Sequence, residues 1–466
     1  MTRTEVAIVG GGISGLSAAW ELHKRRTSFV LLEGTERWGG VIRTETEGGF
    51  LFEAGPDSML AQKPDGLALC RELGLGDRLV PTDMERRRVY VLHRRRLRAL
   101  PEGMALAVPT RILPFLMSSL FTPWGKLRMG LDLAIRPRRD GADESVASFL
   151  RRRFGQECVD RLGEPLLAGI HAGDPERLSI RATFPRFVEL ERKHGGLLRG
   201  MWAAQRPKAP PAAAFHSLLG GMGELVSALL ARLPPQALRL GVALRAIRSG
   251  DNFTLETTAG AVVARSLILA VPPSKAAGLL EPIVPEAGPS LRAVPFASTA
   301  AVLLGFRRSD VGHPLDGYGL VVPATEGLRT AALSFASSKL PGRAPEGHVL
   351  LRAFVGGIRD PKALDLDDAA LLALPQRELQ PVLGLRGGPV AARVFRWPET
   401  TPQMEVGHLA RVAELDARLA AVPGLHMIGA GLRVTGVPDC IAEGRRAAES
   451  AAADQSSRVS DCGGVS

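Results

Sequence analysis

EVAIVGGGISG, residues 5–15, is the stretch that decides the fold of this chain. It opens with an apolar run without alternation, as in a strand buried within a parallel sheet, and residues 16–25 continue with helical periodicity. Between them, Gly10, Gly12 and Gly15 have the G-x-G-x-x-G spacing. Such glycines permit a tight turn, close approach of backbone to a pyrophosphate, and packing of helix on strand. With the free N–H groups of a helix start, the stretch predicts a dinucleotide site.

An acidic residue follows at the expected distance. A second apolar strand is predicted at residues 29–32 and ends in Glu33, 18 residues after Gly15. In dinucleotide-binding folds a carboxylate at this place binds the ribose hydroxyls. The glycine spacing alone is a weak signal in a chain with 52 glycines. The alternative is therefore a glycine-rich turn beside a surface glutamate.

A second glycine cluster lies directly after this strand. In GTERWGGVIRTE, residues 34–45, Arg37 is followed by Gly39 and Gly40. Glycine lets backbone lie against a ligand, and the planar guanidinium suits phosphate; the alternative is a surface turn with incidental arginines. FLFEAGPDSML, residues 50–60, then predicts a strand followed by a Gly-Pro turn. Three such segments early in the chain favour FAD over NAD.

The net charge of +11 comes mainly from arginine. It suits nucleic acid, anionic lipid or a polyanionic small substrate, and the alternative is arginine usage in a GC-rich genome. Because no nucleic-acid-binding motif is present, we expect no such partner. The four cysteines and nine histidines are scattered, so we expect neither disulfides nor a metal site, as in a reducing cytoplasm. We see no signal peptide, and the apolar stretch at 112–125 is too short to span a bilayer.

The rest of the chain predicts further structural units. Residues 104–200 are predicted to be mostly helical, with apolar segments beside a basic flank. This pattern suits a helix lying at a lipid headgroup surface, and the alternative is a core helix with a solvated basic end. Residues 205–214, rich in proline and alanine, predict a loop. A hairpin is predicted at 88–100, and strands at 238–247, 253–258, 261–269, 299–306, 317–322, 349–355 and 390–397; the later ones indicate an antiparallel sheet.

A second loop leading into a helix lies near the other end of the chain. Residues 426–444, HMIGAGLRVTGVPDCIAEG, predict a short strand, a glycine-rich loop from Gly429, and a helix that begins at Pro438. Proline in a first helical turn with Asp439 beside it fits a helix start. We therefore expect two helix N-termini, one from each end of the chain, to face one ligand.

Together these motifs resemble the flavin-containing amine oxidase superfamily. FEAGPDS at 52–58, EPLLAGIHAGDPERLSIRATFP at 164–185, LVVP at 320–323 and GVPDCI at 436–441 are similar to the oxygen-dependent porphyrinogen oxidases of haem synthesis. The resemblance covers nearly the whole chain except its tail. Asp57 and Pro438 resemble the Gram-positive-type branch that oxidises coproporphyrinogen III, and the branch specific for protoporphyrinogen IX is the alternative.

The resemblance implies an α/β fold with a Rossmann-like FAD-binding domain of the amine oxidase type, an antiparallel-sheet substrate domain and a helical, membrane-associating insertion. The discontinuous FAD domain would comprise 1–85, 215–285 and 400–453. The insertion would be 90–205, the substrate domain 286–399, and 454–466 a disordered tail.

The resemblance also assigns the cofactor contacts. The residues expected to contact FAD are Gly10, Gly11, Gly12, Ile13, Ser14, Gly15, Glu33, Gly34, Arg37, Gly39, Gly40, Val41, Gly55, Pro56, Asp57, Val242, Ala270, Trp397, Gly429, Val437, Pro438 and Ile441. The helix start at Pro438 would face the isoalloxazine ring and stabilise negative charge on the reduced flavin.

Substrate contacts follow in the same way. Gly169 matches the glycine that borders the reacting face, and Arg87 matches the arginine that pairs with a propionate; the alternative for Arg87 is a solvated basic run. Tyr318, Val321 and Phe354 match side chains that sandwich the ring, and core packing is the alternative for each. Asp57 is the one motif carboxylate that we nominate as a catalytic helper.

The implied reaction is a six-electron oxidation of the porphyrinogen by three hydride transfers to flavin, which O₂ reoxidises with release of H₂O₂. The alternative hypotheses are a flavin amine oxidase, a carotenoid desaturase and a non-enzymatic flavin-binding scaffold. The expected location is the cytoplasm, with peripheral attachment to the inner face of the membrane. A homodimer and contacts with ferrochelatase or other haem-pathway enzymes are further expectations.

Overall fold

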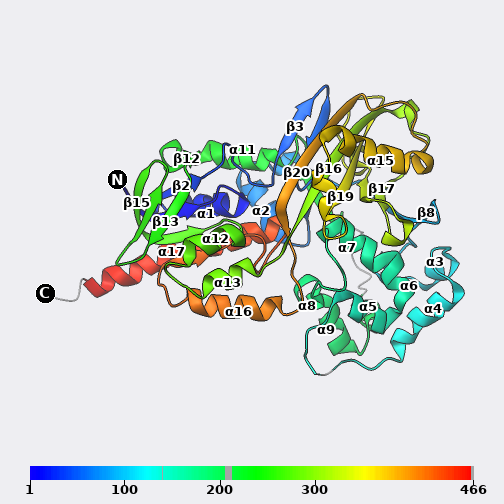
Figure 1. Ribbon diagram of the computed structural model, residues 1–466, viewed down its shortest axis with the longest axis horizontal. Helices are drawn as coiled ribbons and strands as arrows, with labels where there is room; N and C mark the ends of the chain where they lie inside the picture. The colour runs from blue at the N-terminus through cyan, green and yellow to red at the C-terminus, as the bar shows by residue number, and fades with distance from the viewer. Residues whose placement is uncertain (139, 205–212, 463–466) are drawn as a thin grey trace.

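A computed structural model describes residues 1–138, 140–204 and 213–462 (Figure 1). Its first sheet contains the N-terminal strand β1 (Thr2–Val9), which pairs in parallel with β2 and with β15. The strand order is β12 (Leu238–Leu240), β2 (Phe29–Glu33), β1, β15 (Gly260–Leu269), β14 (Phe253–Thr257) and β13 (Leu244–Arg248), with β21 (Leu425–Met427) parallel to β15. Segments from the start, middle and end of the chain therefore build one sheet.

Both faces of this sheet are covered by helices, which explains the unbroken apolar strands. Val6 and Ile8 point to a core formed with α1 (Ile13–Lys24) and α17 (Val437–Cys462). Ala7 and Val9 point to the opposite core. That core includes the helices α12 (Pro273–Leu280), α13 (Ala287–Arg292) and α16 (His408–Leu419). The N-terminus and the end of α17 lie at this end of the molecule (Figure 1).

The second sheet is mainly antiparallel. Its order is β20 (Ala391–Pro402), β16 (Phe296–Arg307), β19 (His348–Gly356), β18 (Thr330–Ser334), β17 (Gly317–Val321), β7 (Arg88–His93) and β8 (Arg96–Ala99). β7 is parallel to β17, and the other pairs are antiparallel. α15 (Asp368–Leu383) covers one face of the sheet. β4 (Phe50–Glu53) and α7 (Glu164–His171) pack on the other face.

Short helices form the third unit, at the lower right of Figure 1. They are α3 (Ile112–Met117), α4 (Pro123–Gly130), α5 (Val146–Phe154), α6 (Gln156–Cys158), α7, α8 (Ile180–Thr183), α9 (Pro185–His194) and α10 (Leu197–Ala204). A five-residue π-helix, Val159–Gly163, leads into α7. No helix in the described part of the chain is long and apolar enough to cross a membrane.

Four predicted boundaries need correction. The hairpin Arg88–Ala99 was placed partly in the helical insertion 90–205, but it extends the second sheet because its apolar residues pair beside β17. α13 packs with the first sheet, so residue 286 does not begin the substrate domain. β20 continues past 400 to Pro402.

The C-terminal tail is the fourth correction. Helix α17 continues to Cys462, although residues 454–466 were expected to be disordered. No glycine or proline interrupts residues 445–462, so the helix has no local reason to end earlier. The predicted loop at 205–214 lies almost entirely outside the described residues, as do 463–466.

Candidate functional site

The N-terminal glycine turn connects β1 to α1 as the sequence predicts. Gly10 has φ +110°, and an added Cβ would lie 2.4 Å from the Ala270 carbonyl oxygen. At Gly15 an added Cβ would lie 1.9 Å from the Gly10 carbonyl oxygen. Glycine is therefore required at both positions for strand and helix to meet. Gly12 is the N-cap of α1, and no side chain caps the helix start, which contains the buried Ile13 and Ser14.

Glu33 lies directly against this turn. Its carboxylate accepts hydrogen bonds from the Gly11 N–H (2.6 Å) and the Thr35 N–H (2.8 Å). The Glu33 carbonyl in turn accepts from the Val242 N–H at 2.8 Å, and the neighbouring Gly34 packs against Ala243. The carboxylate is thus held at the carboxyl end of β2, where a ribose would lie.

The second glycine cluster closes over the first. The Gly39 N–H donates to the Gly11 carbonyl at 2.8 Å, and Gly40 faces Gly12. Arg37 donates to the carbonyls of Trp38, Gly40 and Ile42, so its guanidinium shapes this loop. The next turn is equally tight, because a Cβ on Gly55 would lie 1.8 Å from the Val41 carbonyl oxygen.

The C-terminal loop meets the N-terminal helix. Gly429 has φ +112° and its Cβ direction points toward the Ser14 hydroxyl, 3.9 Å away. Farther along α17, a Cβ on Gly444 would lie 2.3 Å from the Ser14 carbonyl oxygen, so the two helices cross in contact. The Cys440 thiol is hydrogen-bonded to the Ser14 hydroxyl, and burial raises the pKa of Cys440 to about 12. The start of α17, which contains Val437, Pro438 and the buried Ile441, is thereby fixed beside the start of α1.

These loops leave a space that fits the pyrophosphate of a dinucleotide. A Cβ added to Gly12 would meet no atom closer than the Gly40 Cα at 4.0 Å. The backbone conformation at residue 12 does not itself require glycine, since its φ is −73°. The open approach beside an uncapped helix start is therefore the space in which a pyrophosphate would lie.

Asp57 forms a largely buried ion pair at the edge of this region. Lys339 Nζ donates to both carboxylate oxygens at 2.8 Å, and the Ser58 hydroxyl donates to one of them at 2.7 Å. Burial opposes ionisation, but Lys339 and Arg352 outweigh it and hold the pKa of Asp57 well below its ordinary value. Asp57 therefore remains ionised and is a weak base, which argues against the helper role predicted from the sequence.

Arg352 connects Asp57 to the second sheet. Its Nη2 donates to the Ala54 carbonyl at 3.3 Å and the Gly55 carbonyl at 2.5 Å. Trp397 also donates to the Ala54 carbonyl, at 2.8 Å. The Gly55–Pro56 turn is therefore attached to β19 and β20 of the second sheet.

An apolar wall lies next to Arg352 on the same face of the sheet. The Arg352 guanidinium lies 4.7 Å from the centre of the Phe354 ring. Phe354 and Val321 belong to one hydrophobic cluster, and a Cβ on Gly169 would lie 3.6 Å from Val321 Cγ1. Three of the residues expected at the substrate are thus brought together. Tyr318 is not in this cluster, and its hydroxyl donates to Thr82 at 3.0 Å.

Arg87 is exposed just before β7. Arg86 lies 3.7 Å from Asp83, and Arg88 pairs with Asp316, whereas Arg87 has no ion-pair partner in the described residues. Its guanidinium is therefore available to a carboxylate from outside the chain.

His171 is the titratable group nearest to Gly169 in the chain. Burial lowers the pKa of His171 to about 4, so its ring is neutral at physiological pH. Its carbonyl accepts from the Gln403 side chain at 3.0 Å, which anchors the end of α7.

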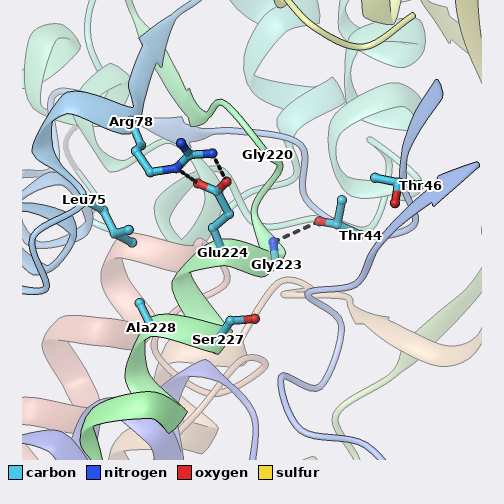
Figure 2. A pocket seen from close by; sticks show the side chains of 9 residues that line it. All are labelled: Thr44, Thr46, Leu75, Arg78, Gly220, Gly223, Glu224, Ser227 and Ala228. Carbon is cyan, nitrogen blue, oxygen red and sulfur yellow. Dashed lines mark hydrogen bonds and ion pairs between the residues drawn. The ribbon is translucent and has the colours of Figure 1, made fainter. Parts of the chain in front are cut away.

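A hollow of about 540 Å³ lies between α11 (Gly223–Arg232) and β3 (Thr44–Glu47) (Figure 2). Glu224 pairs with Arg78 across its wall. Thr44 donates to Glu53 at 2.8 Å and accepts from the Gly223 N–H at 2.8 Å. Because these polar groups satisfy one another, the hollow is a junction between α11 and the β3–β4 hairpin.

Sequence reasoning missed Lys339 and Arg352. Arg352 lies in HVLLRAFVGG, residues 348–357, where one arginine interrupts an apolar strand. A buried charge requires a partner, so this interruption was a usable signal. Lys339 lies in an ordinary polar stretch, and only the folded chain brings it to Asp57.

The fold and the paired glycine loops define a flavin-dependent oxidoreductase. Residues 13–452 match the family described as flavin-containing amine oxidoreductase, and the chain belongs to that family. The coproporphyrinogen III oxidase of Bacillus subtilis is 35% identical, over 96% of this chain and 98% of that protein. That of Propionibacterium freudenreichii is 33% identical, over 96% and 90%. Protoporphyrinogen oxidase 1 of Arabidopsis thaliana chloroplasts is 33% identical, over 87% and 79%.

Solved structures agree with this assignment. The crystal structure of an Exiguobacterium protein named as a protoporphyrinogen oxidase has a TM-score of 0.86 and 31% identity, over 96% of this chain and 98% of that one. A putrescine oxidase has a TM-score of 0.71 at 18% identity, which shows a shared fold only. The family implies a flavin cofactor, as expected from the glycine motifs.

Proposed function

We propose that this protein is a FAD-dependent oxidase that converts coproporphyrinogen III to coproporphyrin III with O₂ as electron acceptor. The observation that supports this most is the meeting of the two distant glycine loops beside a wall that combines apolar side chains with buried cations. Relatives named for this reaction match nearly the full length of the chain. Protoporphyrinogen IX is the second candidate substrate, because plant relatives named for it match most of the chain.

The residues that would hold FAD follow from the space between the loops. Gly12 and Gly40 would border the pyrophosphate, and Glu33 would accept from the ribose hydroxyls. The start of α17 would place its positive dipole end near the flavin ring. Bound FAD would supply a two-electron acceptor, used three times per porphyrinogen and reoxidised each time by O₂ to give H₂O₂.

The chain's own contribution is positioning. Phe354 and Val321 would hold the macrocycle, and Gly169 would leave room for it. Asp57 is held ionised in an ion pair and the pKa of His171 is lowered to about 4, so both are weak bases and neither suits general base catalysis. Orientation of the substrate against the flavin, with water excluded, would lower the barrier without a dedicated acid–base pair.

Anaerobic mixing tests the proposal. The purified holoprotein should lose its flavin absorbance on mixing with coproporphyrinogen III and regain it when O₂ is admitted. Amines and a carotenoid precursor serve as substrates for the rival activities. A bound flavin that no porphyrinogen bleaches would contradict the proposal, and the kcat/KM ratio for the two porphyrinogens decides between them.

We expect Arg87→Ala to raise KM for the porphyrinogen about tenfold, because a hydrogen bond to a charged group contributes about 1.5–3 kcal/mol. FAD content should stay unchanged. Arg86→Ala is the matched control, since Arg86 already lies near Asp83, and it should change KM less than about threefold. Equal effects of the two variants would remove Arg87 from the site.

We also propose that the helical unit attaches to a membrane surface. The apolar side chains of α3 and α4 are unusually exposed: Leu113 to 68%, Met117 to 78% and Trp124 to 78%. Lys126 on α4 and Arg111 at the start of α3 flank this patch. Exposed apolar groups beside cations suit the interface of an anionic bilayer. A product and substrate with apolar rings also suit an enzyme held at such a surface.

Vesicle sedimentation tests the attachment. The triple variant replaces three exposed side chains by glutamate, Leu113→Glu/Met117→Glu/Trp124→Glu. It should bind anionic phospholipid vesicles at least about tenfold more weakly than the wild type, because each inserted apolar side chain contributes about 1.5–3 kcal/mol. Leu240→Glu, at an exposed leucine of the FAD domain, is the control and should bind normally. A wild-type protein that ignores vesicles but self-associates through the patch would show instead that the patch is an interface between copies.

A further inference from the structure

Arg352 is a buried cation whose hydrogen bonds are incomplete. The residue is only 6% exposed, yet its guanidinium donates to two neutral carbonyls, those of Ala54 and Gly55. Its Nε–H is buried and has no hydrogen-bond partner among the residues that the structure describes. An unpaired buried donor on a charged group costs free energy, so the site is incomplete without a further acceptor.

The charges around Arg352 do not balance. Asp57 is the carboxylate that acts most strongly on Arg352, and Lys339 donates to both of its oxygens. Glu53 interacts electrostatically with Arg352, and Arg343 with Glu53. Burial raises the pKa of Glu53, and its hydrogen bonds to Thr44 and Met222 oppose this rise. Glu224 also acts on Arg343 but is paired with Arg78. The cations Lys339, Arg343 and Arg352 therefore outnumber the carboxylates Asp57 and Glu53 even when both are ionised. A ligand that brings one negative charge would complete the cluster.

The position of Arg352 indicates which ligand that is. Arg352 stacks on Phe354, and Phe354 belongs to the apolar wall that contains Val321 and lies against Gly169. On its other side Arg352 holds the Gly55 turn, which is expected to contact the flavin. A macrocycle lying on the wall would bring its carboxylate arms to this edge, where a guanidinium offers a planar fork.

We propose that Arg352, supported by Lys339, binds one propionate of the porphyrinogen and thereby favours the substrate that has four propionates over the one that has two. This inference rests on the proposed function. Coproporphyrinogen III can offer propionates to Arg352 and to Arg87 at once. Protoporphyrinogen IX has vinyl groups in place of two propionates, and a vinyl group beside Arg352 would leave the guanidinium unpaired. Sites built for a polar group reject analogues that lack it.

The test is Arg352→Met, which keeps an apolar chain of similar length and leaves Asp57 paired with Lys339. KM for coproporphyrinogen III should rise about 10- to 100-fold, and KM for protoporphyrinogen IX less than about threefold. Arg352→Lys should recover part of the loss because it restores charge without the fork. FAD content and the affinity for FAD should remain at wild-type values in both variants.

Two results would overturn the inference. One is an equal rise in KM for both porphyrinogens, and the other is loss of FAD in parallel with activity, since either would mean that Arg352 only supports the Gly55 turn. Binding of the non-reacting porphyrins separates this inference from the proposed function. If the wild type oxidises neither porphyrinogen, the proposed function fails; weaker binding of coproporphyrin III, but not of protoporphyrin IX, by Arg352→Met would still support the anchor.

Discussion

Asp57→Asn should lower the free energy of unfolding by about 3–5 kcal/mol, the usual loss when one partner of a buried ion pair is removed. The carboxylate side chain is only 16% exposed, and so is that of Lys339. Asparagine keeps the shape but removes the carboxylate that pairs with Lys339 and acts most strongly on Arg352. Denaturant unfolding of the wild type and the variant measures the loss, in the transition in which the second sheet unfolds.

The double variant Asp57→Asn/Lys339→Met is the matched control. Removing the lysine together with the carboxylate removes the unpaired charge, and buried ion pairs replaced by neutral groups often cost little. The double variant should therefore be more stable than Asp57→Asn alone. If the double variant instead loses as much stability, relative to the wild type, as the two single variants Asp57→Asn and Lys339→Met lose together, the two side chains are not coupled in the way the 2.8 Å contacts indicate.

The same ion pair predicts a pH dependence. Because the pKa of Asp57 is lowered in the folded chain, its contribution is complete above the ordinary carboxyl value of 3.8 and is lost as pH falls toward the lower folded value. Wild type and Asp57→Asn should therefore differ by a constant amount from pH 5 to 8 and converge only in strong acid. A difference that fades already near neutral pH would mean that Asp57 is protonated at that pH.

The cofactor side of the site was predictable because its chemistry lies in short local motifs. Gly10, Gly12 and Gly15 act through spacing along one strand–turn–helix unit, and Glu33 follows at the end of the next strand. The meeting of the two chain ends was also predictable, since two loops that each precede a helix start suit one anionic ligand.

The surroundings of Arg352, where we propose that the substrate binds, were less predictable because they depend on pairing between distant strands. Arg352 lies opposite Leu303 and Ser334, and its contacts with Ala54 and Gly55 come from another unit altogether. Tyr318 shows the same limit: its position beside Thr82 follows from the pairing of β17 with β7, which no local pattern encodes. The domain boundaries failed for this reason too, since a hairpin can join any sheet that leaves an edge open.

Gly12→Ala should abolish most FAD binding while the apoprotein remains folded. The added Cβ would meet no atom closer than 4.0 Å, and the φ of −73° suits alanine, so we expect a change in stability within about 0.5 kcal/mol. The same Cβ would enter the space in which a pyrophosphate must lie close to the backbone. The affinity for FAD should fall at least about tenfold, as measured by titration of apoprotein with FAD and by the flavin content of the purified variant.

Gly15→Ala and Gly278→Ala are the two controls that separate binding from folding. At Gly15 the new Cβ would lie 1.9 Å from the Gly10 carbonyl oxygen, so α1 must shift and both stability and FAD binding should decrease. Gly278 lies in α12 with no atom within 4 Å of an added Cβ, and alanine there should stabilise the helix by about 0.5–1 kcal/mol without any effect on FAD. A Gly12→Ala protein that retains wild-type flavin would show that the cofactor does not approach this turn, and the assignment of the N-terminal loop would then be wrong.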